Sequence, residues 1–240
     1  MPATVAIVQA RMGSSRLPGK VLKMLSGEPM LARVVKRVSR SHRVDKVLVA
    51  TTTEQRDDAL ADWCAGSGWS CFRGSEHDVL DRYYHAAKGA GAEVIVRITS
   101  DCPLIDPEII SAVVEGLELQ GSDYCSNVFP RTYPRGLDVE AFTFSALETA
   151  WREDRNPEWR EHVTQFIVRH PERFAITNLN YDDDCSAFRW TVDTPEDFAL
   201  MEKICAHFPS DDFSWRGVLA VVERHPDWTA INQHIEQKAT

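Results

Sequence analysis

Short apolar runs of strand length alternate with longer stretches of helical spacing through the first half of the chain. The strand-like runs are 5–9, 44–50, 70–72, 94–98 and 123–125. The helix-like stretches are 29–40, 55–66, 76–89 and 107–119. Strands and helices that alternate in this way build a parallel sheet with helices on both faces. The pattern therefore predicts an α/β fold.

The alternation becomes less regular after residue 126. Here the expected strands are 136–142, 174–179 and 188–192, and the expected helices are 145–153 and 158–168. Two closing helices are expected at 195–207 and 215–224, the first of which begins with Pro and two acidic residues after a Thr cap. This half could carry an antiparallel extension of the sheet. Because no linker or repeat interrupts the chain, we expect one domain over residues 1–240.

The composition excludes several classes of protein. Hydrophobic residues make up 43% of the 240 residues and charged residues 26%, as in soluble globular proteins. No segment approaches the roughly 18 consecutive apolar residues of a membrane span, and no secretory signal precedes the first strand, so we expect a cytoplasmic protein with no membrane partner. The six cysteines include no C-x-x-C spacing, which favours reduced thiols over a disulfide frame or a zinc site. A formal net charge of −9 argues against nucleic acid as a partner.

Against this acidic background, the sequence QARMGSSRLPGK at residues 9–20 places a basic loop directly after the first strand, where open α/β sheets bind their ligands. Gly13 permits unusual backbone angles, Ser14 offers a hydroxyl, and several N–H groups could surround phosphate oxygens. The loop is not a Walker loop, because Val21 stands where Ser or Thr is required, and it lacks the dinucleotide pattern G-x-G-x-x-G. The cations that would neutralise a triphosphate are Arg11, Arg16 and Lys20. The alternative interpretation is a solvated basic turn.

Two aspartates extend the candidate chemistry. Asp101 follows the strand-like run 94–98, and Asp193 follows the run 188–192, so both are expected at the carboxyl ends of strands. Mg²⁺ is commonly held by one or two carboxylates together with phosphate oxygens. The pair therefore predicts a metal site, with a cap of the following helix or a turn residue as the alternative role of Asp193. The acidic run 182–184 is instead expected to be a solvated turn.

The ordered set of motifs resembles one known family. The motifs are QARMGSSRLPGK, FRGSEHDVLDRYYHAA, VRITSDCPLIDPE, TYPRGLDVEAF, REHVTQFI and RWTVDTPEDF. They are similar to those of the sugar cytidylyltransferases, the group that includes the CMP-sialic acid and CMP-Kdo synthetases, and within it to the branch named for the spore coat polysaccharide biosynthesis protein SpsF. The similarity runs from about residue 4 to about residue 200. Thr99-Ser100 stands where Kdo-type enzymes have Gln-Gly, so the resemblance does not imply Kdo as the acceptor.

The resemblance implies a fold and a reaction. The fold is a Rossmann-like, GT-A-like nucleotidyltransferase fold, with a mostly parallel sheet, helices on both faces and a small antiparallel extension. The reaction joins CMP from CTP to an acidic sugar or similar small acceptor, releases pyrophosphate and serves surface polysaccharide biosynthesis. Mg²⁺ or Mn²⁺ is the implied cofactor, and a homodimer is the expected assembly. Residues 1–126 would form the nucleotide-binding half, 127–194 the acceptor-binding half and 195–240 the C-terminal helices.

The resemblance also assigns roles to individual residues. The implied catalytic residues are Arg11, Lys20 and Asp101, and the implied metal ligands are Asp101 and Asp193. The implied phosphate-side contacts are Ala10, Arg11, Gly13, Ser14, Arg16 and Lys20. The base and ribose would be bound by Arg73, Asp78 and Arg82. The acceptor side would be formed by Arg135, Asp138, Glu140 and His162.

Several alternatives stay open at this point. Asp78 could instead cap a helix, Arg82 could pair with Asp81 on the surface, and His162 could be structural rather than a general base. Arg135 suits a carboxylate or a phosphate, because a guanidinium binds either group in a bidentate manner. A glycosyltransferase that uses a nucleotide sugar could share the fold, and a catalytically silent module could bind CTP without turning it over. The sequence leaves the acceptor and the general base unassigned.

Overall fold

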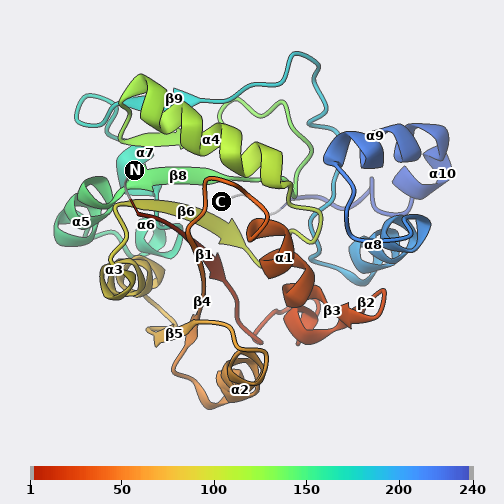
Figure 1. The fold of residues 1–240 in the computed structure, drawn as a ribbon, viewed down its shortest axis with the longest axis horizontal. Helices are drawn as coiled ribbons and strands as arrows, with labels where there is room; N and C mark the ends of the chain where they lie inside the picture. Colours follow the sequence, from red (N-terminus) through yellow and green to blue (C-terminus); the bar gives the residue numbers. More distant parts are fainter. Residues whose placement is uncertain (1–2, 238–240) are drawn as a thin grey trace.

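A computed structural model of the protein describes residues 3–237, so residues 238–240 of the expected closing segment lie outside the described part. Its main sheet has seven strands in the order β5-β4-β1-β6-β8-β7-β9 (Figure 1). Their bounds are β1 Thr4–Gln9, β4 Lys46–Thr52, β5 Cys71–Gly74, β6 Val94–Thr99, β7 Tyr124–Ser126, β8 Glu140–Thr143 and β9 Ile176–Asn178. A second, two-stranded sheet joins β2, Met24–Leu25, to β3, Glu28–Pro29.

The helices connect these strands and close the chain. In the first half they are η1 Lys20–Leu22, α1 Met30–Val38, η2 Gln55–Asp57, α2 Asp58–Gly66, α3 Val79–Ala90 and α4 Pro107–Gln120. In the second half they are α5 Phe144–Glu153, α6 Pro157–Glu161, α7 Gln165–Val168, α8 Pro195–His207, α9 Trp215–Arg224 and α10 Pro226–Thr229. The last three gather at one end of the molecule (Figure 1). No helix among residues 3–237 is both long and apolar enough to cross a membrane.

The direction of each strand determines which strand ends lie at the same edge of the sheet. β1 pairs in parallel with β4 on one side and with β6 on the other. β8 runs antiparallel to both β6 and β7, and β9 returns to a parallel pairing with β7. This confirms the expected mostly parallel sheet with an antiparallel extension. The carboxyl ends of β1 and β6 therefore lie side by side, which brings the basic loop 9–20 next to the segment that contains Asp101.

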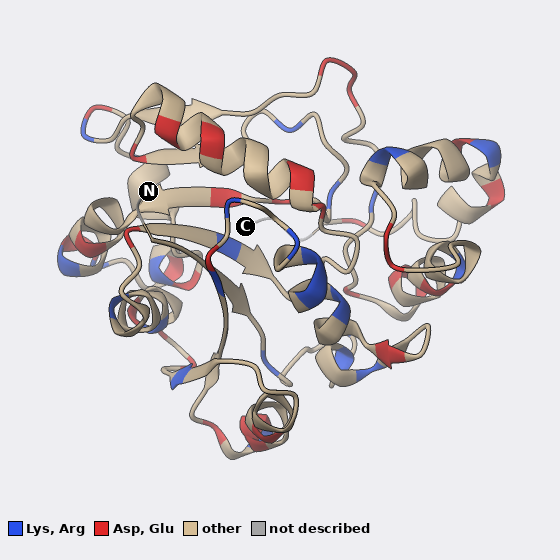
Figure 2. Cartoon of the chain, in the orientation of Figure 1, with Lys and Arg blue, Asp and Glu red and all other residues tan. Residues whose placement is uncertain are grey.

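The two faces of the sheet bury separate hydrophobic clusters. Val5 and Ile7 of β1 pack with residues of α3, α5 and α7, whereas Ala6 and Val8 pack with residues of α1, α4, α8 and α9. Alternate residues of a strand point to opposite faces, so a strand that is apolar at every position is buried on both sides. Helices thus cover both faces, as expected. Figure 2 shows that charged residues of both signs lie mainly on helices and loops and that few lie on the strands.

Three expected elements in the second half differ from the structure. The expected strand 188–192 is wrong: the segment is extended but has a single bridge, between Arg189 and Arg135, because its N–H groups bond to carbonyls in two different loops. The expected helix 158–168 is interrupted by Val163, whose φ of 64° no helix accommodates, so α6 and α7 form instead. The expected strand 136–142 begins only at Glu140, because a turn and a φ of 104° at Gly136 precede it.

Candidate active site

The loop after β1 is closed on itself and anchored to the neighbouring connection. The carbonyl of Met12 accepts from the N–H groups of Ser14 (2.9 Å) and Gly19 (3.1 Å). The N–H of Met12 donates to Asp57, at 2.6 Å, and the other oxygen of this fully buried carboxylate accepts from the Thr52 hydroxyl. Gly19 ends the loop with a φ of 70°, a conformation that glycine adopts without strain, and starts η1. The loop is therefore held in a defined shape by its own backbone bonds and by Asp57 outside it.

Lys20 joins the two aspartates that the sequence analysis selected. Its ammonium nitrogen lies 3.0 Å from Asp101 Oδ2, 3.0 Å from Asp193 Oδ1 and 2.6 Å from the carbonyl oxygen of Val192. Burial lowers the pKa of Lys20, but Asp101 and Asp193 together raise it more, so the pKa lies above its ordinary value of 10.5. The sheet thus brings two carboxylates from distant parts of the sequence to one cation.

Asp193 faces three cations. Besides Lys20, it pairs with Arg16 at 2.9 Å and with Arg189 at 3.0 Å. Burial raises the pKa of Asp193, but these cations, led by Lys20, lower it more, so the pKa lies below its ordinary value. The helix that follows is capped by Thr194 in a capping box and not by Asp193. The alternative role of Asp193 as the helix cap is therefore wrong, and its carboxylate is directed to the cation cluster.

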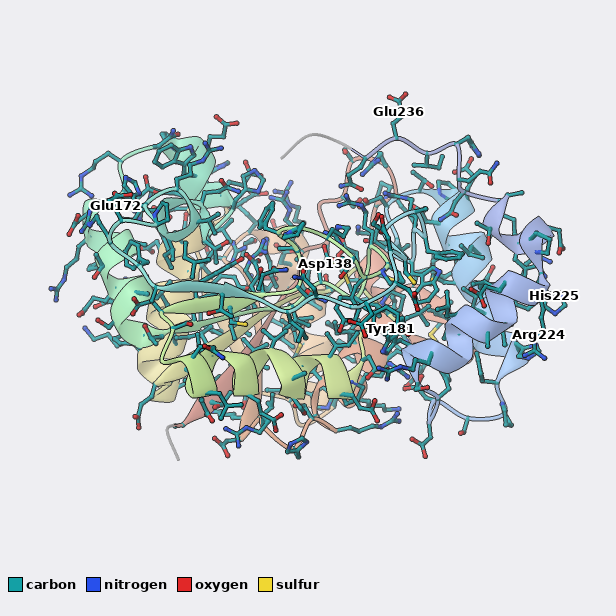
Figure 3. The ribbon with its side chains drawn as sticks, turned by 90° about the horizontal axis from the view of Figure 1, so that it is seen from above. Asp138, Glu172, Tyr181, Arg224, His225 and Glu236 are labelled. Atoms are coloured by element: carbon teal, nitrogen blue, oxygen red, sulfur yellow. The ribbon has the colours of Figure 1, made fainter. Side chains whose placement is uncertain are left out.

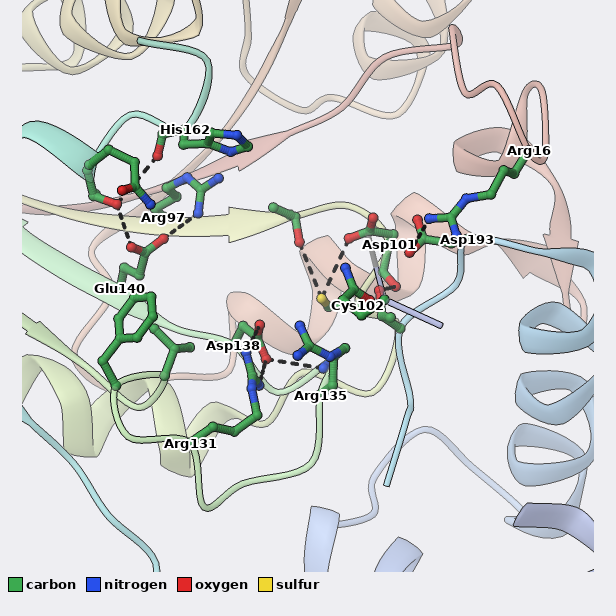
Figure 4. A pocket seen from close by; sticks show the side chains of 18 residues that line it. Arg16, Arg97, Asp101, Cys102, Arg131, Arg135, Asp138, Glu140, His162 and Asp193 are labelled. Carbon is green, nitrogen blue, oxygen red and sulfur yellow. Dashed lines mark hydrogen bonds and ion pairs between the residues drawn. The ribbon is translucent and has the colours of Figure 1, made fainter. Parts of the chain in front are cut away.

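Two cavities meet at these aspartates. The first, which we call the loop cavity, has a volume of about 330 Å³ and is lined by Arg11, Gly13, Ser14, Arg16 and Lys20 of the basic loop, among others. The second, which we call the polar cavity, has a volume of about 310 Å³ (Figure 4). Both are lined by Arg16, Thr99, Asp101 and Asp193. A ligand in each cavity would therefore contact the same pair of carboxylates.

The polar cavity takes much of its wall from one segment, the connection 127–139 between β7 and β8. Besides Arg16, Asp101 and Asp193, its charged lining residues are Arg97, Arg131, Arg135, Asp138 and Glu140, with His162 beside them (Figure 4). Asp138 lies between the sheet and the C-terminal helices (Figure 3). Glu236, which is not part of the cavity lining, points away from the molecule (Figure 3). The four acceptor-side residues of the sequence analysis, Arg135, Asp138, Glu140 and His162, are thus brought together.

Most charges of the polar cavity are already paired. Glu140 forms an ion pair with Arg97 and accepts from the hydroxyls of Tyr124 (2.7 Å) and Thr164 (2.6 Å). Asp138 holds Arg131 through two bonds of 2.5 and 2.7 Å. Within the described part of the chain, the Arg135 side chain has no hydrogen bond or ion pair, and burial, followed by repulsion from Arg131, lowers its pKa. The geometry leaves this guanidinium available to an anion.

A close contact between the backbone at Arg135 and the segment 188–191 fixes the position of Arg135. Its N–H bonds to the carbonyl of Phe188 at 3.0 Å, and its carbonyl accepts from the N–H of Trp190 at 2.7 Å. A Cβ at Gly136 would lie 2.5 Å from the carbonyl carbon of Trp190. Together with the positive φ at this position, the contact restricts position 136 to glycine and fixes the Arg135 segment against residues 188–191.

The structure does not bring the predicted base- and ribose-binding residues to either cavity. Arg73 bonds to the carbonyl of Thr52 (2.8 Å), and Asp78 caps α3 and pairs with Arg160 (2.8 Å). Arg82 is buried and donates to the carbonyl of Ser75, and its Nε and Nη2 have no partner among residues 3–237. Ala10 is also buried, with its N–H bonded to Ala50. The run Asp182, Asp183 and Asp184 is exposed, as expected for a solvated turn.

Several residues of the site were missed by the sequence analysis. Arg97 lies within the apolar strand-like run 94–98. A single charged residue in such a run could have indicated a functional or paired position, because a buried charge needs a partner. Arg189 belongs to the motif RWTVDTPEDF, and Arg131 lies directly before TYPRGLDVEAF. The role of Asp57 as the anchor of the basic loop had no signal in the local sequence.

Residues 5–238 match the family model described as cytidylyltransferase. The chain belongs to the cytidylyltransferase family. The enzyme is 38% identical to an uncharacterized protein of Methanocaldococcus jannaschii over 98% of this chain and 96% of that protein. It is 34% identical to the spore coat polysaccharide biosynthesis protein SpsF of Bacillus subtilis over 92% of this chain and 94% of that protein. A 3-deoxy-manno-octulosonate cytidylyltransferase of an Anaeromyxobacter species is 38% identical over 49% of this chain and 48% of that protein.

Solved structures give the same result. A cytidylyltransferase of Leptospira borgpetersenii covers 100% of both chains with a TM-score of 0.91 and 35% sequence identity. A CMP:2-keto-3-deoxy-manno-octonic acid synthetase complexed with CTP covers 85% of this chain and 99% of its own, with a TM-score of 0.65 and 20% identity, and so shows the shared fold. The enzyme is thus a CTP-dependent nucleotidyltransferase of the SpsF-like branch, with the expected Rossmann-like nucleotidyltransferase fold.

Proposed function

We propose that the enzyme transfers CMP from CTP to an acidic sugar or a similar small anionic acceptor, releases pyrophosphate and serves surface polysaccharide biosynthesis. The observation that carries this proposal is the meeting of a loop cavity lined by cations with an arginine-rich polar cavity at Asp101 and Asp193. Such a junction suits a reaction in which two substrates approach each other from separate cavities.

The loop cavity suits the triphosphate. In the reaction an acceptor oxygen forms a bond to the α-phosphorus, and the bond from that phosphorus to the oxygen of the leaving pyrophosphate breaks. Negative charge moves to pyrophosphate, so cations that contact it stabilise the transition state. Arg11, Arg16 and Lys20 line the cavity and take this role, with Gly13 and Ser14 beside them.

On the same proposal, residues 1–126 are the nucleotide-binding half. Lys20 then exchanges its two carboxylate partners for phosphate oxygens when CTP binds. Ala10 supports the phosphate loop from the buried end of β1. The base and ribose would be bound near Arg73, Asp78 and Arg82; the Nε and Nη2 atoms of Arg82 are buried and have no hydrogen-bond partner among residues 3–237.

Asp101 and Asp193 fit the divalent metal that the family resemblance implies. Carboxylate oxygens are the ligands that Mg²⁺ and Mn²⁺ prefer, and both carboxylates already face one positive charge at 3.0 Å. Within residues 3–237 no cluster of three or more His, Cys, Asp or Glu is arranged for a metal. When bound, the ion would neutralise charge on the phosphates.

The acceptor would bind in the polar cavity, within the acceptor-binding half 127–194. Arg135, which has no ion pair in the described chain, would hold the anionic group of the acceptor, while Asp138 and Glu140 fix the directions of Arg131 and Arg97. His162 lines the same cavity and is one candidate to remove the acceptor proton, and Asp101 is another. From the C-terminal segment that follows α10, Gln237 lines the same cavity.

Release of pyrophosphate from CTP tests the proposal. We expect pyrophosphate with CTP, Mg²⁺ and one member of a panel of acidic sugars, and little with ATP, GTP or UTP. CTP with Mg²⁺ should also raise the melting temperature more than the other nucleotides do, because a ligand that binds only the folded state stabilises it. Equal shifts from all four nucleotides would contradict cytidine specificity. Consumption of an intact nucleotide sugar with release of a nucleoside diphosphate would instead show a glycosyltransferase.

We also propose a homodimer, on the strength of the family resemblance. Light scattering at working concentration should give twice the mass of one 27.1 kDa chain. A monomer would overturn this part of the proposal and leave the reaction unaffected.

A further inference from the structure

Arg189 is a buried arginine that contacts Asp193 from outside the two cavities. Its residue is 8% exposed, and its guanidinium holds Asp197 in a bidentate pair, with Nε at 2.8 Å from Oδ1 and Nη2 at 2.9 Å from Oδ2. The same Nη2 donates to Asp193 Oδ2 at 3.0 Å. Arg189 lines neither the loop cavity nor the polar cavity, so any effect it has on substrates passes through Asp193.

Asp197 fixes the backbone of the same residue. It is fully buried in the first turn of α8, and its Oδ2 accepts from the N–H groups of Asp193 (2.9 Å) and Thr194 (3.0 Å). The Arg189–Asp197 pair therefore holds Asp193 twice, at its backbone through Asp197 and at its carboxylate through Arg189. Two such attachments leave the carboxylate little freedom to turn away from Asp101.

The C-terminal segment is attached to this pair. Asn232, which is buried, donates to the carbonyl of Arg189 at 3.0 Å and to Asp197 Oδ1 at 2.8 Å. Gln237 accepts from Arg189 Nη1 at 2.5 Å and lines the polar cavity. The end of the described chain thus contributes both a cavity wall and a support for Asp193.

The three cations around Asp193 are not equivalent. Lys20 and Arg16 line the loop cavity and are available to phosphate oxygens when nucleotide binds. Arg189 stays with Asp197 whatever occupies the cavities, because two of its three donor nitrogens are engaged there. Of the three, Arg189 is the one that can keep the direction of Asp193 unchanged through the reaction.

We propose that Arg189 is a positioning residue of the active centre, which orients the Asp193 carboxylate and couples it to the C-terminal segment through Asn232 and Gln237. The inference rests on the proposed function, since it takes Asp193 to hold the divalent ion. It goes beyond that function because it assigns a role to a residue that touches neither substrate.

Substitution of Arg189 in an Asp193→Asn background tests the inference. Arg189→Gln should lower kcat by about 10- to 100-fold, the usual effect of losing a group that orients a metal ligand, with the KM values for CTP and acceptor within about twofold of wild type. Binding of Mn²⁺ to the CTP complex, followed by electron paramagnetic resonance, should weaken by a similar factor. In the double variant Arg189→Gln with Asp193→Asn, kcat should equal that of Asp193→Asn alone.

Two controls make the result specific. Arg216→Gln removes an exposed arginine on α9 and should leave kcat and Mn²⁺ binding at wild-type values. If Arg189→Gln does not fold, Arg189→Lys replaces it: this variant keeps the charge but cannot form the bidentate pair, and it should show the same pattern with a smaller loss.

The outcomes separate the inference from the proposed function. Wild-type kcat and Mn²⁺ binding in Arg189→Gln, with Asp193→Asn inactive, would overturn the inference and leave the proposed function intact. Additive losses in the double variant would likewise overturn it. Wild-type activity of Asp193→Asn would overturn the inference and the assignment of Asp193 as a metal ligand, whereas absence of CTP-dependent pyrophosphate release in the wild-type enzyme would overturn the proposed function itself.

Discussion

The loop cavity and the polar cavity use positive charge in different ways. In the loop cavity Lys20 and Arg16 share carboxylates that also face the other cavity, and Arg11 has no ion pair within residues 3–237. In the polar cavity Arg97 and Arg131 each have a carboxylate of their own. The first set of cations can change partners when a ligand arrives, whereas the second is fixed before it arrives.

On the proposed function, this difference indicates that the loop cavity provides affinity for the triphosphate and the polar cavity provides selectivity among acceptors. A triphosphate is a strong anion that several flexible cations bind well, and exchangeable ion pairs release them without leaving a charge buried and unpaired. A sugar presents hydroxyls at defined positions and at most one or two charges. Donors held by their own carboxylates keep a fixed geometry, so they discriminate among acceptors by shape.

Removal of the shared carboxylates should have the largest effect, because both cavities depend on them. Asp101→Asn and Asp193→Asn should each lower kcat by about 10³-fold, comparable to the loss of a strong electrostatic group at a reaction centre, and each should weaken metal dependence. Ligands of one ion act as a unit, so the double variant should lose much less than the sum of the two losses in free energy. Steady-state kinetics across Mg²⁺ concentrations measures both quantities.

Asp183→Asn, in the exposed acidic turn, is the matched control and should behave as wild type. The assignment of Asp193 would fail if Asp193→Asn lowered only stability, as loss of its ion pairs with Lys20, Arg16 and Arg189 would, while pyrophosphate release stayed near the wild-type rate.

Reciprocal changes in KM should separate the two cavities. Arg11→Ala should lower kcat/KM for CTP by about 10- to 100-fold, the equivalent of one charged hydrogen bond, with part of the loss in kcat because the contact strengthens in the transition state; the acceptor KM should stay within about twofold of wild type. Arg135→Ala should do the reverse. Arg152→Ala, on the exposed face of α5, should alter neither value. A common KM change for both substrates in either variant would show that the cavities do not act separately.

A smaller effect is expected in the pH dependence of stability. The folded-state pKa of Asp193 is lowered, so its ionised form contributes stability above the unfolded pKa near 3.8, and this contribution is lost as the pH falls through the folded value. Lys20 has a raised pKa, so its contribution is complete below 10.5 and is lost at still higher pH. Acidification below about pH 4 should therefore destabilise wild type more than Asp193→Asn in urea unfolding. Parallel curves for the two proteins would contradict this.

The first half of the fold and its site could be predicted because they depend on local rules. A strand that is apolar at every position must be buried on both faces, and the carboxyl ends of neighbouring parallel strands meet at one edge. These rules place the loop 9–20 beside Asp101 without any knowledge of the remainder of the chain. The meeting of Lys20 with Asp101 follows from the same geometry, whereas Asp193 is brought there by a non-strand segment whose Val192 N–H bonds to the carbonyl of Asp101.

The remaining parts depend on contacts between distant residues. Arg97 meets Glu140 because β8 enters the sheet antiparallel to β6 with these two residues in register, and nothing near either residue encodes that register. The segment 188–192 has the apolar pattern of a strand, but its partners are loop carbonyls. Arg189 contacts Asp197 because the capping box at the start of α8 fixes the position of Asp197. The local pattern of apolar and polar residues does not predict such pairings between distant residues.

The connection 127–139 has a consequence for how the enzyme diversifies. Its two ends are held together in the sheet, where Ser126 of β7 pairs with Glu140 of β8, so the stretch between them is a closed loop on a fixed base. This one peptide supplies Phe129, Arg131 and Arg135 to the polar cavity, whereas the basic loop lies on a different strand. On the proposed function, a different sequence in this connection would change the choice of acceptor and leave the use of CTP unchanged. Evolution can therefore exchange one substrate at a time on this scaffold.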